Sequence, residues 1–513
     1  MSGLPTSPWW RSGVVYQVYP RSFADANGDG VGDLEGVRQH LDHLAWLGVD
    51  AVWLSPFYRS PMADFGYDVA DFCDVDPFFG DLAGFDRLLA EAHALGIRMV
   101  VDLVPNHTSD QHRWFQASRS SRDDPQRSWY VWQDGGGPDA PPNNWLGAFI
   151  DGGRAWTWDN ATAQWYLHQF LPQQPDLNWA NPEVVDAIHG VMRFWLDRGV
   201  DGFRIDVVHC IGRDPAFPDD EPPWSEIPHC VSNEHSSTHG HIREMRRLAD
   251  AYDGDRVLIG ETALPGTQWV APYYGEGDEL HLAFNFAATQ AAWDAAVWSK
   301  RIARITELLD PREAWPSWVL SNHDIPRHRT RLGGSEARAR AAAVVLLTQR
   351  GTPFVYAGEE LGLEDAVVPV DRVVDPGGRD GCRAPLPWTS AAGHGWGENP
   401  WLPFPPDAPA RSVEAQRADP TSVLHLYRRL LQARRASPAL SVGAQEMLDG
   451  PDGVLGWRGT APDGDQRAVF VNMGSDPVAV DATGTVEVAS DGEGEGAAFT
   501  GGLAPDTALV LIP

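Results

Sequence analysis

The chain has 513 residues, 43% of them hydrophobic, which is enough for a sizeable core and for about two to four domains. Lys and Arg number 40 against 71 Asp and Glu, and a net charge of −31 should repel nucleic acids and anionic membranes. We therefore exclude polyanionic partners. The chain has no signal-peptide pattern and no uncharged apolar run of membrane-spanning length, so we expect a cytoplasmic protein, as a monomer or a homodimer.

The cysteines do not form a recognisable disulfide framework. They are irregularly spaced and include no CxxC pair, at Cys73, Cys210, Cys230 and Cys382. We expect free thiols. The pairs at 209–210 and 229–230, each a His followed by a Cys, leave a metal site with nitrogen and sulfur ligands as an alternative to isolated side chains.

Short apolar segments rich in β-branched residues recur along the chain and predict buried strands. They are Val14–Tyr19, Val49–Ser55, Ile97–Val104, Val200–Val207, Val257–Glu261, His281–Phe286, Trp318–Ser321 and Pro353–Ala357. Segments with apolar residues three and four positions apart separate several of them and predict helices, at 37–47, 85–95 and 184–195. Eight strands alternating with helices favour the α/β class and a parallel (β/α)8 TIM barrel, since eight strands can close on themselves.

Two regions depart from this alternation. Residues 107–172 contain seven Trp and runs of Gly and Pro, and are too long for an ordinary loop, so we predict an inserted subdomain after strand three. Residues 441–513 contain short apolar runs separated by Gly and Asp, which predicts a C-terminal antiparallel β domain of the sandwich type. The catalytic barrel would then comprise 1–106 and 173–440.

Carboxylates follow three of the predicted strands. In a barrel the C-terminal strand ends meet on one rim, so Asp206, Glu261 and Asp324 should converge there. Arg204 lies two residues before Asp206 and faces the same way, where it can keep that carboxylate ionised. Glu261 follows an apolar strand, which suits the raised pKa of a general acid. One ionised and one protonated carboxyl group are the apparatus of glycoside hydrolysis.

These segments carry a family resemblance. Residues 102–107 (DLVPNH), 202–206 (GFRID), 260–262 (GET) and 322–324 (NHD) resemble, in order and spacing, the four signature regions of the α-amylase superfamily, glycoside hydrolase family thirteen. Residues 174–178 (QPDLN) resemble the fifth region of its oligo-1,6-glucosidase and α-glucosidase branch. The resemblance extends over essentially the whole chain.

The resemblance implies roles for individual residues. Asp206 matches the nucleophile of a retaining mechanism, Glu261 the general acid/base, and Asp324 the third carboxylate, which grips the sugar hydroxyls. A supporting acid is matched by Asp102. The residues that match the substrate-binding positions are Asp64, Tyr67, His107, Phe149, Phe170, Arg204, His323, Arg379 and Arg383. For the two Phe residues, core packing of the inserted subdomain is an equal alternative. The segment around Arg383 departs mildly from the family pattern, with Ala384 in place of Thr.

An early loop has oxygen-bearing side chains at every second position, as an EF-hand does, but its twelfth position is Gly36 instead of Glu. Within the family it resembles the calcium loop of the same branch. The implied ligands are Asp25, Asn27, Asp29, the Val31 carbonyl and Asp33, holding a structural Ca²⁺, or Mg²⁺ in its place. A turn without metal is the alternative, and hydrolysis itself needs no metal.

The resemblance and the site together predict a retaining, exo-acting α-glucosidase that releases glucose from short neutral α-glucosides, with transglucosylation as a further activity. The long loop after strand four, from Asp214 to Trp224 and beyond, is expected to wall the pocket. Val207 resembles branch members that accept α-1,6 bonds, so oligo-1,6-glucosidase is an alternative, as are trehalose synthase and sucrose isomerase. His209 leaves the aglycone preference open. A non-catalytic, transporter-associated binding protein is the alternative from another class.

Overall fold

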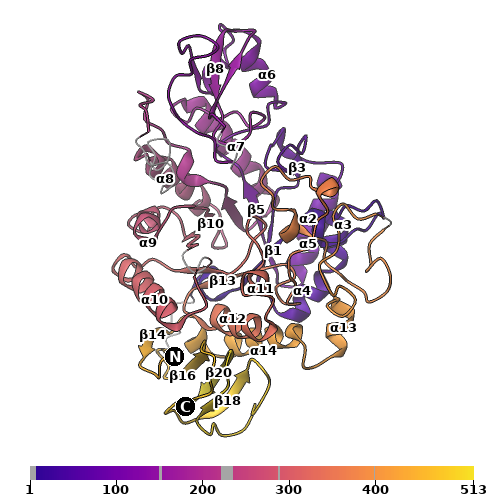
Figure 1. The fold of residues 1–513 in the computed structure, drawn as a ribbon. Coiled ribbons are helices and arrows are strands. Elements are labelled where there is room, and N and C mark those ends of the chain that lie inside the picture. The colour runs from indigo at the N-terminus through magenta and orange to yellow at the C-terminus, as the bar shows by residue number, and fades with distance from the viewer. Residues whose placement is uncertain (1–6, 150–152, 221–234, 287–288, 290, 398) are drawn as a thin grey trace.

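The computed structural model describes residues 7–149, 153–220, 235–286, 289, 291–397 and 399–513. At its centre is a parallel sheet of eight strands in the order β11-β10-β9-β5-β2-β1-β13-β12 (Figure 1). The strands are β1 (Val15–Val18), β2 (Ala51–Leu54), β5 (Arg98–Leu103), β9 (Gly202–Ile205), β10 (Val257–Gly260), β11 (Leu282–Ala283), β12 (Ser317–Val319) and β13 (Thr352–Tyr356). Each predicted strand is present, so the predicted barrel is confirmed.

The sheet curves into a nearly closed barrel. Its two end strands are joined by a side chain, since Ser317 Oγ of β12 donates a hydrogen bond of 2.7 Å to the Ala283 carbonyl of β11. Residues that point inward from the strands form a separate apolar core, which includes Val15, Val100, Ile259, Phe284 and Phe354. This packed interior leaves the chemistry to the strand ends.

Helices cover the outside of the barrel. The longer ones are α5 (Leu82–Ala94), α7 (Pro182–Arg198), α8 (Ser237–Asp250), α10 (Ala295–Leu309), α12 (Glu336–Thr348) and α14 (Val423–Ala436). Their boundaries follow capping rules: α7 begins after Asn181, whose side chain accepts from the Glu183 amide, and ends at Gly199 in the left-handed conformation. The helix predicted over 37–47 is two helices, α3 (Leu34–Gln39) and α4 (Leu41–Leu47), which meet at His40, a residue with non-helical dihedrals.

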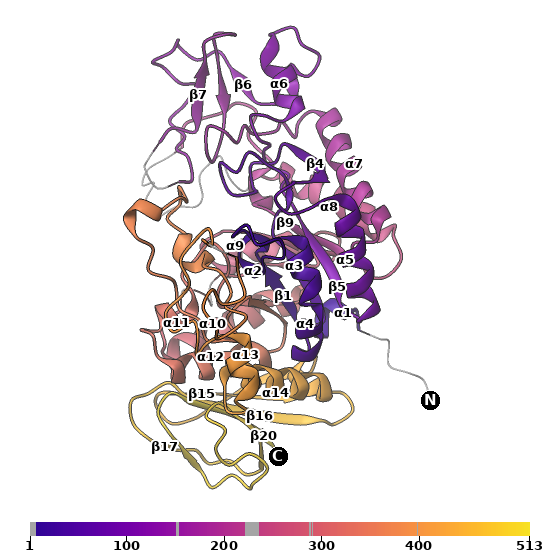
Figure 2. The ribbon, with the colours of Figure 1, turned by 90° about the vertical axis from the view of Figure 1, so that its right-hand side faces the viewer.

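The Trp-rich region forms a small antiparallel sheet of β6 (Trp132–Gln133), β8 (Gln164–Leu167) and β7 (Trp156–Asp159), with α6 (Arg113–Ser120) beside it. It lies at one end of the molecule (Figures 1 and 2). Trp145, Trp156 and Trp165 are buried in its own core. Trp is unusually frequent in this chain, and most of the Trp residues are core residues.

The C-terminal region forms a five-stranded antiparallel sheet at the opposite end (Figure 2). Its strands, in spatial order, are β14 (Ala444–Leu448), β15 (Val454–Thr460), β16 (Gln466–Asn472), β20 (Thr507–Ile512) and β18 (Thr485–Ala489), and a pair, β17 (Val478–Ala479) and β19 (Gly502–Leu503), accompanies it. The sheet contacts α12 through β20 and α14 through β18. The antiparallel β domain is confirmed, whereas the sandwich type and the residue boundaries between domains stay predictions. No helix among the described residues is long and apolar enough to span a membrane.

Candidate active site

Three acidic side chains meet at the C-terminal ends of the barrel strands. Asp206 directly follows β9, Glu261 directly follows β10, and Asp324 lies in the turn after β12. Because parallel strands end on the same rim, residues more than a hundred positions apart come together. All three line one small cavity of about 130 Å³. The predicted convergence is therefore what the structure shows.

The same cavity gathers most of the predicted substrate-binding residues. Its remaining lining is Asp64, Tyr67, His107, Ala148, Phe149, Phe170, Val207 and Arg379. Arg204, His323 and Arg383 lie behind this lining, each with at most 1% of its surface exposed. The volume is well below the roughly 300 to 1,000 Å³ of sites for drug-sized ligands, so the cavity fits one small unit.

Arg204 is the centre of the acidic cluster. Its Nη1 donates to Asp206 at 2.7 Å and to Asp102 at 2.9 Å, and its Nη2 donates to Glu261. Asp102 is held from its other side by the indole N–H of Trp53, at 3.0 Å. The expectation that Arg204 contacts Asp206 is confirmed, but the arginine bonds Glu261 as well. Contact with Arg204 therefore does not by itself distinguish nucleophile from acid.

Electrostatics in this cluster are dominated by burial. Burial raises the pKa of Asp206 well above its ordinary range, the charge of Arg204 lowers it, and the charges of Glu261 and Asp102 raise it again. The pKa of Asp102 is raised to about 6 by burial, against the opposing effect of Arg204. One guanidinium is shared by three carboxylates, so it does not offset their desolvation. The simple argument that Arg204 keeps Asp206 ionised is thus incomplete.

Val207, next to Asp206, has an unusual backbone. Its φ is 35° and its ψ 44°, the left-handed region that β-branched residues rarely adopt. In this conformation the Val207 amide donates to the Glu261 carboxylate at 3.2 Å, and the following amide, of Val208, donates to the Glu261 carbonyl at 3.2 Å. The turn after β9 therefore holds Glu261 next to Asp206.

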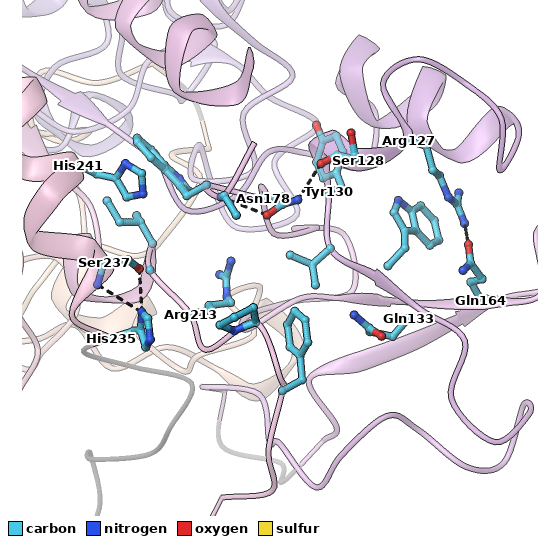
Figure 3. Close-up of a pocket in the computed structure, with 18 of the residues that line it drawn as sticks. Arg127, Ser128, Tyr130, Gln133, Gln164, Asn178, Arg213, His235, Ser237 and His241 are labelled. Atoms are coloured by element: carbon cyan, nitrogen blue, oxygen red, sulfur yellow. Dashed lines mark hydrogen bonds between the residues drawn. The ribbon is translucent and has the colours of Figure 1, made fainter. Parts of the chain in front are cut away.

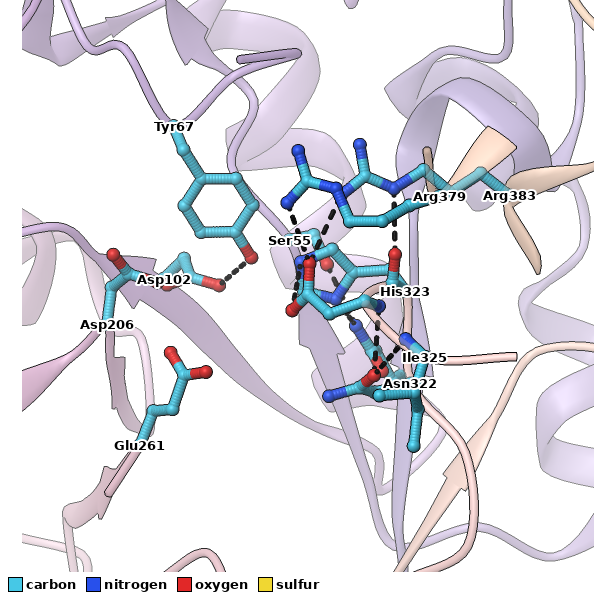
Figure 4. A network of polar contacts seen from close by, with 12 residues as sticks. Ser55, Tyr67, Asp102, Asp206, Glu261, Asn322, His323, Ile325, Arg379 and Arg383 are labelled. Carbon is cyan, nitrogen blue, oxygen red and sulfur yellow. Dashed lines mark hydrogen bonds and ion pairs between the residues drawn. The ribbon is translucent and has the colours of Figure 1, made fainter. Parts of the chain in front are cut away.

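Asp324 is surrounded by donors, among them Arg379 and Arg383, whose side chains are seen close to His323 in Figure 4. Arg379 Nη1 and Arg383 Nη2 reach the same oxygen, Oδ1, at 3.0 and 3.2 Å, and His323 Nε2 lies 3.3 Å from Oδ2. Burial disfavours the charged carboxylate, but His323, Arg379 and Arg383 together hold the pKa of Asp324 below its ordinary value. Asp324 therefore remains an anion that can accept hydrogen bonds from sugar hydroxyls.

The wall opposite Asp206 comes from the hairpin of β3 (Tyr58–Arg59) and β4 (Asp71–Val75). The loop between these strands carries Asp64 and Tyr67. Arg379 Nη2 donates to Asp64 Oδ1 at 2.5 Å, which ties this loop to the segment after β13. The Gln174 amide donates to Asp64 Oδ2 at 3.0 Å and lies 3.1 Å from His107 Nε2.

Gln174 is a functional residue that we did not single out from the sequence. Gln174 is the first residue of the motif 174–178. The position of this motif directly after the inserted region is the sequence feature that could have indicated a role for Gln174. Its side-chain oxygen accepts from the Leu171 amide at 3.0 Å, which fixes the orientation of its amide group. Gln174 therefore positions both an acid and a histidine of the pocket.

The two pocket histidines are neutral. Burial lowers the pKa of both His107 and His323 to about 3. The amide nitrogen of Gln17 lies 2.7 Å from His323 Nδ1, and since an amide nitrogen donates, Nδ1 accepts and Nε2 carries the proton. His323 also stacks on Tyr67, with 3° between the ring planes. His323 can thus donate from Nε2 toward Asp324 or a ligand.

Two phenylalanines close another side of the cavity. Phe149 and Phe170 form an edge-to-face pair with centroids 6.0 Å apart, and Arg379 lies over the Phe149 ring at 5.4 Å. Of the two alternatives for these rings, the structure favours the pocket wall. No Trp is among the residues that line the cavity in the described part of the chain, so its apolar contact surface comes from Tyr67, Phe149 and Phe170.

The described part of the loop after β9 does not lie where the sequence analysis predicts it. Within the described residues 214–220, Pro218 accepts from Trp145 Nε1 at 2.9 Å and Asp219 accepts from the Asn144 amide at 3.0 Å. This part therefore packs on the inserted subdomain and does not line the small cavity. Residues 221–224, and the His229 and Cys230 of the alternative metal site, lie outside the described residues.

In the predicted calcium loop, the carboxylates accept from backbone amides. Asp25 accepts from Gly28 at 2.7 Å and from Gly30 at 2.9 Å, and Asp33 accepts from Gly36 at 2.6 Å. Burial raises the pKa of Asp33, and the charge of Asp25 adds to this effect. Carboxylate, amide and carbonyl oxygens are ligands that suit Ca²⁺. Among the described residues no group of three or more His, Cys, Asp and Glu is arranged to hold a metal, so the calcium site stays a prediction.

A larger cavity of about 810 Å³ lies elsewhere, between the inserted subdomain and the start of α8 (Figure 3). Arg127, Arg213 and His241 are among its lining residues, but none of the three rim acids is. Arg213 is already paired with Asp176 at 2.5 Å. The convergence of acids assigns the chemistry to the smaller cavity.

The comparisons with known proteins agree with this geometry. Residues 17–443 match the family model of the α-amylase catalytic domain, and the chain therefore belongs to the α-amylase family and is a glycoside hydrolase. It is 41% identical over 486 residues to a probable alpha-glucosidase of Rhizobium meliloti (strain 1021), covering 88% of this chain and 87% of that protein. It is 36% identical to an oligo-1,6-glucosidase of Parageobacillus thermoglucosidasius over 525 residues, or 92% and 91% of the two chains. The crystal structure of the alpha-glucosyl transfer enzyme XgtA superposes with a TM-score of 0.92, at 40% identity and 99% coverage of both chains.

A pH dependence follows from the burial of Asp206. A nucleophile acts as its anion, and an acid whose pKa is raised becomes protonated at a higher pH than usual. As the pH is lowered, activity should therefore begin to fall at a pH above about 4, the ordinary pKa of Asp. The measurement is kcat/KM against pH, which reports the free enzyme. An acidic limb at or below pH 4 would contradict the raised pKa.

Proposed function

We propose that the protein is a retaining, exo-acting α-glucosidase that releases glucose from the non-reducing end of short, neutral α-glucosides. The observation that carries the proposal is the meeting of Asp206, Glu261 and Asp324 in one small cavity. The relatives named alpha-glucosidase and oligo-1,6-glucosidase support the substrate class. All three acids are present, which argues against the non-catalytic alternative.

The roles follow from position and from the family match. Asp206 attacks the anomeric carbon and forms the covalent glucosyl-enzyme, while Glu261 protonates the leaving oxygen and then deprotonates the incoming water. Both carboxylates bond one guanidinium group, that of Arg204, so they lie close together. Close carboxyl groups, about 5 to 5.5 Å apart, are typical of retaining enzymes, whereas inverting enzymes need about 6.5 to 9.5 Å.

Exo-action is supported by the contacts between lining residues at one wall of the cavity. The ion pair between Asp64 and Arg379 joins two loops across it, and the ring of Phe149 lies under the same guanidinium. A chain that continues past this wall would have to break the ion pair. This argument replaces the one from the loop after β9, whose described residues lie elsewhere.

Transfer of the glucosyl unit to a second sugar is the second candidate. The similarity to a solved alpha-glucosyl transfer enzyme favours it, since transfer and hydrolysis share the covalent intermediate and differ in the acceptor. Among linkages, α-1,4 and α-1,6 bonds are both consistent with Val207 beside the nucleophile, and isomerisation of trehalose or sucrose remains an alternative outcome of the same chemistry.

Replacing the nucleophile tests the mechanism. Asp206→Ala should lose at least ~10³-fold in kcat on p-nitrophenyl α-glucoside, because the covalent step cannot form. Asp186→Ala, which removes an exposed acid of α7, is the matched control and should retain full activity. Turnover of the Asp206 variant within tenfold of the wild type would refute the assignment.

Product analysis tests exo-action and linkage together. Incubation with maltose, isomaltose, trehalose and sucrose, followed by NMR, should show glucose released first as the α-anomer from at least one of them. Soluble starch should yield glucose only, and slowly. Maltooligosaccharides appearing early from starch would contradict exo-action, and β-glucose as the first product would contradict retention.

We also propose that the loop 25–33 binds a structural Ca²⁺ ion, with Mg²⁺ as a weaker substitute. The ligands would be the side chains of Asp25, Asn27, Asp29 and Asp33 and the carbonyl of Val31. The pKa of Asp33 is raised by burial and, to a smaller extent, by the charge of Asp25, and a cation would offset both effects. The ion would stabilise the fold and take no part in the chemical step.

Calcium titration tests this site without reference to activity. A Ca²⁺ concentration a hundred times Kd should add about 2.7 kcal/mol of stability and raise the thermal unfolding midpoint, and EDTA should reverse the shift. Asp29→Ala should abolish the shift, while the exposed Asp42→Ala should leave it intact. An Asp29→Ala variant with an unchanged calcium response would exclude this loop.

A further inference from the structure

Two like charges converge on Asp324, which poses an electrostatic problem. Arg379 and Arg383 donate to the same oxygen of Asp324, and their side chains are only 14% and 0% exposed. Two guanidinium groups this close repel each other, and little water is present to screen the repulsion. One carboxylate does not neutralise two cations: Asp64 pairs with Arg379, and a second anion contacts both arginines.

The second anion is Asp375, a residue outside the family motifs. Its Oδ1 accepts from Arg379 Nη2 at 2.7 Å and from Arg383 Nη1 at 3.1 Å. Its Oδ2 accepts from Arg379 Nε at 2.9 Å and from the Arg379 backbone amide at 2.7 Å. Asp324 and Asp375 each bond both arginines, so the four side chains form a closed ring, in which Asp375 bonds three side-chain nitrogens.

Asp375 is itself fixed and lies away from the ligand space. It is 4% exposed, and its backbone amide donates to Asp380 Oδ2 at 3.2 Å. Asp375 is not among the residues that line the small cavity, whereas Arg379 and Asp324 are. Its carboxylate therefore acts on the cavity through the arginines.

The bond to Nε sets the direction of the Arg379 side chain. With Nε and one edge of the guanidinium held by Asp375, the group is aimed so that Nη1 meets Asp324 and Nη2 meets Asp64. Both of these acids line the cavity. A small rotation of the Arg379 guanidinium would break one of the two contacts.

We propose that Asp375 is a positioning residue that fixes Arg379 and Arg383 against Asp324 and so shapes the pocket for the glucosyl unit. The inference rests on the proposed α-glucosidase function. It goes beyond that function in assigning part of the sugar-binding geometry to a residue that does not touch the sugar.

The test compares Asp375→Asn with the wild type by kcat, KM and competitive inhibition by glucose, which occupies only the glucosyl site. We expect kcat/KM to fall about 10- to 100-fold, the usual effect of removing a group that orients a ligand-binding residue. The glucose inhibition constant should rise with it. Asp371→Asn removes an exposed acid of the same segment and should behave as the wild type.

A double-mutant cycle separates positioning from a general loss of stability. If Asp375 acts through Arg379, the variant with both Asp375→Asn and Arg379→Lys should be no worse than the poorer single variant. Independent effects would instead multiply, and that result would overturn the proposal. So would a folded Asp375→Asn enzyme with kcat/KM and glucose inhibition within twofold of the wild type.

Asp375→Glu serves if the Asn variant does not fold. It keeps the charge but moves the carboxylate by one methylene, so the positioning role predicts a loss of at least about fivefold in kcat/KM. Wild-type kinetics in this variant would overturn the proposal. The proposed function fails separately, if the wild-type protein releases no glucose from any α-glucoside.

Discussion

The site depends on one buried cation that is shared by three carboxylates. Arg204 is 1% exposed and bonds Asp102, Asp206 and Glu261, which come from three adjacent barrel strands. Removing one partner from such a buried cluster typically costs about 3–5 kcal/mol, because the remaining charges lose their compensation. The cluster therefore ties the register of the strands to the geometry of the acids. Burial raises the pKa of Asp206, and the negative charges of Glu261 and Asp102 raise it further.

A second set of charges, on the far side of the cavity, has two arginines for its acids Asp64, Asp324 and Asp375. There Asp324 is matched by two arginines, and its pKa lies below the ordinary value. The pocket thus combines Asp324, whose pKa is lowered, with Asp206, whose pKa is raised. Such a division lets neighbouring carboxyl groups perform different tasks at one pH.

The barrel and the three rim acids could be predicted because strand pattern and motif order are local in the sequence. Each strand is apolar, and its acid follows within a few residues, so chain order alone brings Asp206, Glu261 and Asp324 to one rim.

The partners of Arg379 could not be predicted this way. Its contact with Asp64 joins residues 315 positions apart through loops of irregular backbone. Asp375 lies only four residues before Arg379, but an acid at that spacing is indistinguishable from a surface salt bridge until burial is known. The loop after β9 is a similar case: its described residues 214–220 pack on the inserted subdomain, and loop length alone does not predict that surface.

The backbone at Val207 has a consequence for how this protein can change. A β-branched residue in the left-handed region carries strain of about 1–3 kcal/mol, and here the strain lies next to the nucleophile. Glycine would remove the strain but would also free the turn whose amide holds Glu261. Substitution of Val207 is therefore limited by two requirements: the side chain must fit the cavity, and the main chain must stay rigid. Local stability is thus lower at Val207, the residue whose main chain holds Glu261 beside Asp206.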